Sequence, residues 1–186
     1  MSDLFDIHDM PIQDLRLLQR KPITDSRGYL ERIFCADTLK SLIPGKNIVQ
    51  INHTLTAKRG AARGMHYQYP PHAETKFISC LTGKVFDVAV DLRKNSPTFG
   101  QWEGHRLSAE NRRQLFIPPG FAHGYCVLSD SADVAYKCSD YYHPEDEGGL
   151  IWNDPEVGID WPVKNPILSE KDKAYPNLDA IPLPQS

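Results

Sequence analysis

Apolar and polar residues alternate over short segments of this chain, and glycine or proline separates the segments. Lys84–Leu92 is rich in β-branched and aromatic residues and lies between Gly83 and the turn residues 95–97. This segment is too short for a core helix, so the pattern predicts a strand. The same pattern predicts strands over residues 15–18, 47–54, 76–81, 101–107, 114–117, 124–128 and 134–142.

Turn signals recur about every 8 to 14 residues, a spacing typical of all-β sandwiches and barrels. Fifteen prolines and 12 glycines leave no room for a long amphipathic helix. We predict a short helix over residues 36–42, a helical turn over 108–112, and a proline-punctuated tail over 162–186 that wraps the domain as coil with short helical turns. The prediction is a single all-β domain over residues 1–186, a jelly-roll β-sandwich or barrel with short peripheral helices.

Composition narrows the functional classes. The 186 residues are 40% hydrophobic and 24% charged, which is typical of a globular domain. The net charge of −3 gives no basic excess for nucleic acid or an anionic membrane. The polar start is not typical of a signal peptide, so we expect a cytoplasmic protein with neither nucleic-acid nor membrane partners. The cysteines lie apart, which predicts reduced, mostly buried thiols at Cys35, Cys80, Cys126 and Cys138.

The first cluster with candidate chemistry is the run Arg63–Gln68, followed by Lys76. Arginine and lysine bind phosphate or a developing oxyanion, and His66 is the residue type most often used as a general base near neutral pH. The alternative interpretation is a polar loop with a surface lysine.

Two further clusters have the same double interpretation. In Ile117–Tyr125, two prolines and two glycines hold His123 in a defined direction, either toward a site or as a hydrogen-bonded core histidine. Tyr136 and Lys137 are neighbours on a predicted strand and therefore face opposite sides. If Lys137 faces solvent, Tyr136 faces the interior, either as a packed core residue or as part of a cavity shared with His66.

The first two of these clusters, Arg63–Gln68 and residues 117–124, occur in order with residues 86–93, 96–100, 107–111, 152–154 and 161–162. The ordered set resembles the dTDP-4-dehydrorhamnose 3,5-epimerase family of cupin-fold sugar-nucleotide enzymes over roughly residues 20–176. The resemblance implies a cupin-type jelly roll and a homodimer in which N-terminal strands, about residues 1–50, cross to the partner. It also implies an isomerase that uses no metal or other cofactor. The activity implied is inversion of C3 and/or C5 beside the C4 ketone of a nucleotide-linked 4-keto-6-deoxy sugar, in deoxysugar or surface polysaccharide biosynthesis.

The same resemblance implies roles for individual residues. By motif position, His66 resembles the family's base and Tyr136 its acid. Asp172 resembles the carboxylate paired with the base, and Lys76 the lysine at the keto oxygen. Seven further residues resemble the lining of the substrate site: Arg27, Gln50, Asn52, Arg63, His123, Glu147 and Lys171.

Three positions depart from the family pattern. Leu30 stands where many members carry a base-stacking aromatic, Arg32 where they carry a substrate-binding glutamate, and Ile51 where they carry an aspartate. All three lie in segments that resemble the nucleotide- and sugar-binding side. We therefore expect a nucleotide selectivity that differs from that of the dTDP-preferring members.

Two other functions compete with the epimerase. A metal cupin such as a dioxygenase would use His66, Glu74 and His123 as ligands, but metal cupins usually present two histidines two residues apart, and here the second position is Gln68. One imidazole fewer weakens a site for iron or zinc. The other alternative is a non-catalytic sugar-nucleotide binder.

Overall fold

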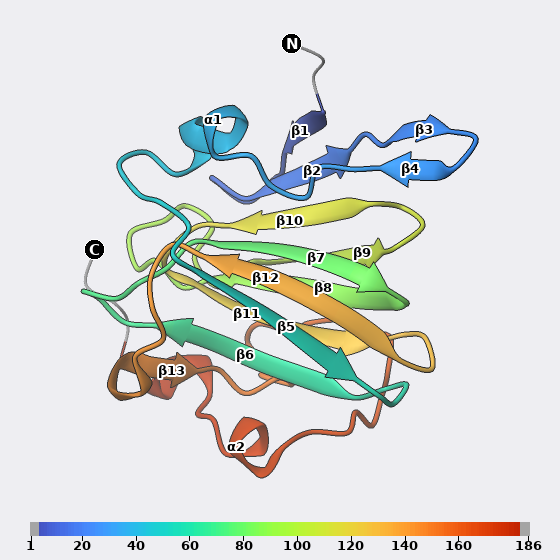
Figure 1. The fold of residues 1–186 in the computed structure, drawn as a ribbon. Coiled ribbons are helices and arrows are strands. Elements are labelled where there is room, and N and C mark those ends of the chain that lie inside the picture. The colour runs from blue at the N-terminus through green and yellow to red at the C-terminus, as the bar shows by residue number, and fades with distance from the viewer. Residues whose placement is uncertain (1–3, 183–186) are drawn as a thin grey trace.

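The computed structural model describes residues 4–182, which form two large antiparallel sheets that pack face to face (Figure 1). The first sheet has six strands, in the order β1 (Phe5–Asp9), β2 (Arg16–Arg20), β10 (Arg113–Ile117), β7 (Lys76–Thr82), β12 (Ala132–Cys138) and β5 (Gln50–Thr56). The second has five, in the order β13 (Glu147–Gly149), β6 (Ala62–Gln68), β11 (Phe121–Val127), β8 (Lys84–Asp91) and β9 (Trp102–Ser108).

From β5 onward the chain crosses repeatedly between the two sheets, so strands distant in sequence become neighbours. Strand β7 lies between β10 and β12, and β11 lies between β6 and β8. The sheets form a sandwich, which confirms the predicted all-β, cupin-type jelly-roll class.

The space between the sheets is apolar on one side only. Toward β9 and β10 it is filled by inward-facing apolar residues of both sheets, among them Val85, Leu107 and Leu115, each fully buried. Toward β5 and β6 the inward positions are polar, because β5 presents Gln50 and Asn52 on that face. The strands on this side therefore enclose a cavity instead of a packed core.

Peripheral segments cover the outer faces of both sheets. The helix α1 (Ala36–Leu39) and the 3-10 turn η1 (Lys40–Leu42) confirm the short helix predicted over 36–42, and Leu39 packs with Phe77 and Phe116 on the first sheet. The tail carries α2 (Glu170–Lys173) and η3 (Leu178–Ala180), as predicted, and a further 3-10 turn, η2 (Pro144–Asp146), precedes β13. Residues 1–3 of the predicted N-terminal segment and residues 183–186 of the tail lie outside the described residues.

A small hairpin, β3 (Ile23–Asp25) and β4 (Gly28–Leu30), extends away from the two large sheets (Figure 1). All six of its strand residues are exposed. Among residues 4–182, no helix has the length and the apolar composition that crossing a bilayer requires.

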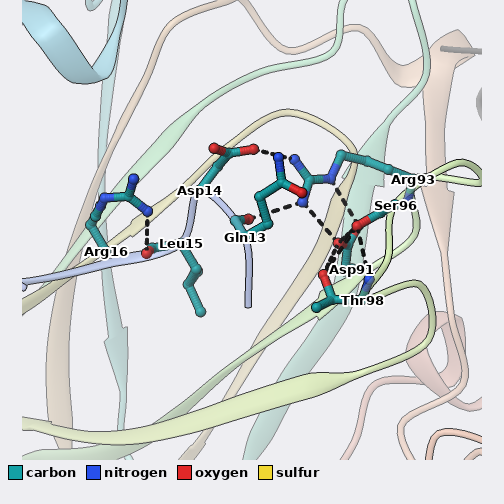
Figure 2. A network of polar contacts seen from close by, with 8 residues as sticks. All are labelled: Gln13, Asp14, Leu15, Arg16, Asp91, Arg93, Ser96 and Thr98. Carbon is teal, nitrogen blue, oxygen red and sulfur yellow. Dashed lines mark hydrogen bonds and ion pairs between the residues drawn. The ribbon is translucent and has the colours of Figure 1, made fainter. Parts of the chain in front are cut away.

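Buried Asp91 ties the β1–β2 turn to the loop after β8 (Figure 2). Its carboxylate accepts hydrogen bonds from Arg93, Ser96 and Thr98, and the Arg93 guanidinium also pairs with Asp14 at 2.7 Å. Burial opposes ionisation of Asp91, but these hydrogen bonds outweigh it and lower the pKa of the carboxyl group. The predicted turn at residues 95–97 is thus an anchoring loop.

Several strand predictions were incomplete. The run Arg63–Gln68 is strand β6 and not a loop, while residues 139–142 leave the sheet after Cys138. The strand expected over 47–54 begins at Gln50. Residues 108–112 form a turn in which the Arg112 N–H donates to the Ser108 carbonyl at 3.0 Å. The four cysteines are free thiols, three of them buried, as predicted.

Candidate active site

A cavity of about 830 Å³ opens between the sheets at the β5 and β6 side. Every residue that the sequence assigned to the site lines it, except Arg27: His66, Tyr136, Asp172, Lys76, Gln50, Asn52, Arg63, His123, Glu147 and Lys171. These residues come from six strands and one helix, β5, β6, β7, β11, β12, β13 and α2. The fold therefore gathers the predicted set into one concave site.

Two glycines allow the strands that carry the cavity histidines to approach closely. His66 on β6 lies directly opposite His123 on β11. A Cβ atom on Gly64, whose φ is +112°, would lie 2.6 Å from the Gly124 Cα. A Cβ atom on Gly124 would lie 2.7 Å from the Arg63 carbonyl oxygen on β6, which is also too close. Any larger residue at either glycine would push the two strands apart.

His66 is held by a carboxylate from the tail. Its Nε2 lies 2.7 Å from Asp172 Oδ1, and Asp172 is brought there by α2, whose first turn is capped by Ser169. Burial opposes ionisation of Asp172, but the hydrogen bond and charge of His66 outweigh it, so the pKa of the carboxyl group is lowered. An ionised Asp172 accepts the Nε2 proton and leaves Nδ1 as the ring nitrogen that can take a proton.

A second histidine–carboxylate pair lies beside the first. His123 Nε2 lies 3.0 Å from Asp87 Oδ2, and Asp87 is fully buried on β8. The ring of His123 is therefore oriented from behind, with only 9% of the residue exposed. Both interpretations of this histidine hold in part, since it is hydrogen-bonded within the sandwich and also faces the cavity.

Lys76 projects into the cavity from the first residue of β7. Its Nζ lies 3.1 Å from Glu74 Oε1, and the two side chains are 12% and 10% exposed. Cys138 on β12 is its direct partner across the sheet. The lysine is therefore an oriented cation in the cavity wall and not the surface lysine of the alternative interpretation.

Tyr136 lies on β12, in the sheet opposite the one that carries His66. It is partly buried and lines the cavity. Burial chiefly, with the nearby Cys138 and Tyr125, raises the pKa of its hydroxyl group. Tyr136 is thus a protonated donor near neutral pH, and not only a packed core residue.

Charged groups also line the mouth of the cavity. Glu147 on β13 accepts hydrogen bonds from the Tyr142 hydroxyl at 2.7 Å and from the Lys171 ammonium. Burial opposes ionisation of Glu147, but these two donors outweigh it and lower the pKa of its carboxyl group. Gln50 accepts from the Tyr142 N–H at 3.3 Å. This network places a half-exposed cation, Lys171, at the rim.

Arg27 lies apart from this cavity. It sits in the exposed turn of the β3–β4 hairpin, where its guanidinium pairs with Asp25 at 2.6 Å. Leu30 and Ile51 are 62% and 66% exposed, and neither they nor Arg32 line the cavity of their own chain.

The sequence interpretation did not include Tyr142, Tyr125, Thr54 or Cys138, all of which line the cavity. Alternation along the strands could have found some of them, because residues two apart face the same side. Thr54 follows Asn52 by two positions, and Cys138 follows Tyr136 by two.

The three ligands of the metal-cupin alternative each have another partner. His66 pairs with Asp172, His123 with Asp87 and Glu74 with Lys76. Within the described part of the chain, no three histidine, cysteine or acidic side chains converge in a way that could hold a metal ion.

Comparison with known proteins assigns the family. The family model described as dTDP-4-dehydrorhamnose 3,5-epimerase matches residues 9–180. A Neisseria gonorrhoeae protein with that name is 51% identical over 170 residues, covering 91% of this chain, and the chain spans about half the length of that relative. A Shigella flexneri protein of the same name is 48% identical over 162 residues, covering 87% of this chain and 89% of the relative.

A solved structure agrees with these matches. The Legionella pneumophila dTDP-6-deoxy-D-glucose-3,5-epimerase, in complex with dTDP-4-keto-L-rhamnose, superposes with a TM-score of 0.93 at 44% identity, covering 98% of each chain. With a family match over most of its length and this agreement of fold, the chain belongs to the dTDP-4-dehydrorhamnose 3,5-epimerase family.

Proposed function

We propose that this protein is an isomerase that inverts C3, C5 or both in a nucleotide-linked 4-keto-6-deoxy sugar, within deoxysugar or surface polysaccharide biosynthesis. The observation that carries the proposal is the position of two proton-transfer groups on opposite walls of one cavity. His66, paired with Asp172 at 2.7 Å, projects from the second sheet, and Tyr136 projects from the first.

Epimerisation requires a base and an acid on opposite faces of the sugar ring. A hydrogen beside a ketone is acidic only because its loss gives an enolate. His66 takes that proton at Nδ1 on one face of the sugar ring, while Asp172 stabilises the imidazolium that forms. Tyr136 returns a proton from the other face, which inverts the carbon. Return from the face of His66 would only restore the starting sugar.

The enolate oxygen needs a compensating charge in a site that excludes water. Lys76, whose side chain is 12% exposed, supplies an ammonium from the cavity wall. We assign to substrate binding the six other lining residues that the sequence predicted: Gln50, Asn52, Arg63, His123, Glu147 and Lys171. Arg63 and Lys171 are cations suited to the diphosphate of a sugar nucleotide.

We propose that the protein is a homodimer in which the β3–β4 hairpin of the N-terminal segment, about residues 1–50, crosses to the partner, so that Arg27 completes the partner's site. The strands β1 and β2 and the helix α1 of that segment pack on their own chain. Two observations support this dimer. The β3–β4 hairpin extends from the sandwich with 62% of Leu30 exposed, and the outer face of β5 exposes Ile51 at 66% and Leu55 at 58%. Light scattering tests it, and a monomeric mass together with full activity would refute it.

The test of the activity is incubation in D2O with dTDP-, GDP- and CDP-linked 4-keto-6-deoxy sugars, followed by NMR. Deuterium should enter at C3, C5 or both, together with inversion at the labelled carbon. Binding of a sugar nucleotide without deuterium uptake would favour the non-catalytic binder. Fractionation of cells should recover the protein in the cytoplasm. In binding assays, the protein should bind neither nucleic acid nor lipid vesicles.

A further inference from the structure

Glu74 is a buried carboxylate in the cavity wall that the proposed proton transfers leave without a role. Its side chain is 10% exposed, and its Oε1 lies 3.1 Å from the Nζ of Lys76. This is the sole ion pair of Lys76 within residues 4–182. An ionised carboxylate so little exposed to water is costly unless its partners compensate for the lost hydration.

Glu74 has a second neighbour across the sheet. Cys138, the residue opposite Lys76 on β12, places its thiol near the Glu74 carboxylate. Burial, assisted by the charge of Glu74, raises the pKa of this thiol to about 12. The thiol therefore stays protonated, so Glu74 faces a neutral side chain from β12 and the ammonium of Lys76 from β7.

A buried carboxylate beside Lys76 matters because a lysine side chain has four rotatable bonds and a strongly hydrated ammonium. Electrostatic stabilisation of an oxyanion is effective when the cation is already in place before the charge develops. We propose that Glu74 is a positioning residue, which holds the ammonium of Lys76 where the C4 oxygen gains charge as the enolate forms. This inference rests on the proposed epimerase function.

A competing role for Glu74 is as a second base. The substrate has two acidic C–H groups, at C3 and at C5. A carboxylate in the cavity could remove the proton from one of them alone. The two roles differ in outcome. A positioning residue acts on the shared oxygen and affects both carbons, whereas a second base affects only the carbon that it deprotonates.

The experiment compares Glu74→Gln, Lys76→Met and the double variant with wild type, by NMR in D2O and by steady-state kinetics. A matched control is Glu103→Gln, which removes a half-buried, ion-paired carboxylate that does not line the cavity. Calorimetric dTDP affinity and melting temperature are measured for each variant. The wild type is measured first, because its failure to epimerise would refute the proposed function independently of Glu74.

Glu74→Gln should lower kcat about 10- to 100-fold, which is less than the about 10²- to 10³-fold lost with a direct oxyanion donor, because Glu74 acts only through Lys76. Deuterium exchange should fall equally at C3 and C5, while KM and dTDP affinity stay nearly unchanged. The control Glu103→Gln should behave like wild type. In the Lys76→Met background, Glu74→Gln should have no further effect, because the group that it positions is gone.

Three results would overturn the inference: an unchanged kcat, loss of exchange at one carbon only, or additive effects in the double variant. Should Glu74→Gln fail to fold, Glu74→Asp keeps the charge but shortens the side chain. It should then show a smaller loss of kcat with unchanged dTDP affinity, and an unchanged kcat in that variant would also count against the positioning role.

Discussion

Two substitutions should separate the two proton transfers. Tyr136→Phe removes only a hydroxyl group in the cavity wall and keeps the ring that packs against the core. The free energy of unfolding should therefore change by less than about 1 kcal/mol. Removing the acid should slow formation of the inverted sugar by about 10²- to 10⁴-fold.

His66→Ala has a different structural cost. Asp172, whose side chain is 6% exposed, loses its 2.7 Å hydrogen bond, which should cost about 1–3 kcal/mol of stability. His66→Gln serves as the second variant, because its amide can still donate to Asp172 but cannot act as a base near neutral pH. Neither variant should exchange deuterium at C3 or C5.

The assay is an NMR time course in D2O for the single variants and wild type. Because His66 is 34% exposed in its side chain, its captured proton can exchange with solvent before it returns. Tyr136→Phe should therefore place deuterium in the recovered substrate while inversion nearly stops. Normal inversion in Tyr136→Phe, or continued exchange in either His66 variant, would refute the assignment of roles.

The remaining predictions concern other parts of the site. Asp172→Asn should lower kcat about 10- to 100-fold. Because the pKa of Asp172 is lowered in the fold, its ionised form adds stability that is present above its unfolded pKa of about 3.9 and is lost as the pH falls through the folded value. The difference in melting temperature between wild type and Asp172→Asn should accordingly shrink below about pH 4. Mixing inactive Arg27→Ala and Tyr136→Phe chains should restore about a quarter of wild-type activity, since half of the dimers are mixed and each has one intact site; no recovery would contradict a shared site. The enzyme should remain active after EDTA treatment, because His66, Glu74 and His123 each pair with another side chain. Loss of activity with EDTA, and its recovery on adding a divalent metal, would refute this prediction. Because of Leu30 and Arg32, kcat/KM for dTDP-4-keto-6-deoxyglucose should not exceed kcat/KM for GDP- and CDP-linked substrates by a wide margin. A wide margin in favour of the dTDP-linked sugar would refute this prediction.

The sequence alone was sufficient where local pattern decides structure. Alternation and turn residues predicted β8 nearly residue for residue, and the all-β class followed from many such segments. The same alternation placed Tyr136 and Lys137 on opposite faces of β12, and Tyr136 lines the cavity, but Lys137 is 5% exposed and does not face solvent as the prediction assumed. The order of the motifs along the chain also indicated the family.

Strand β6 shows where the pattern fails. Its inward positions face a polar cavity, so His66 and Gln68 stand where a core strand would have apolar residues, and the run looked like a loop. Met65 and Tyr67 still alternate with His66 and Gln68, but the apolar pair packs beneath the tail and the polar pair faces the cavity, so the apolar face of this strand is not the one toward the space between the sheets.

The partners of the site residues were decided only by the tertiary structure. Asp172 lies 106 positions after His66 and reaches it because the tail folds back over the second sheet. Asp87 orients His123 from an adjacent strand, and Glu74 is directed to Lys76 by the start of β7. A carboxylate far along the chain has no local signature, because its position depends on how strands cross between two sheets and on which of their inward faces remain unfilled.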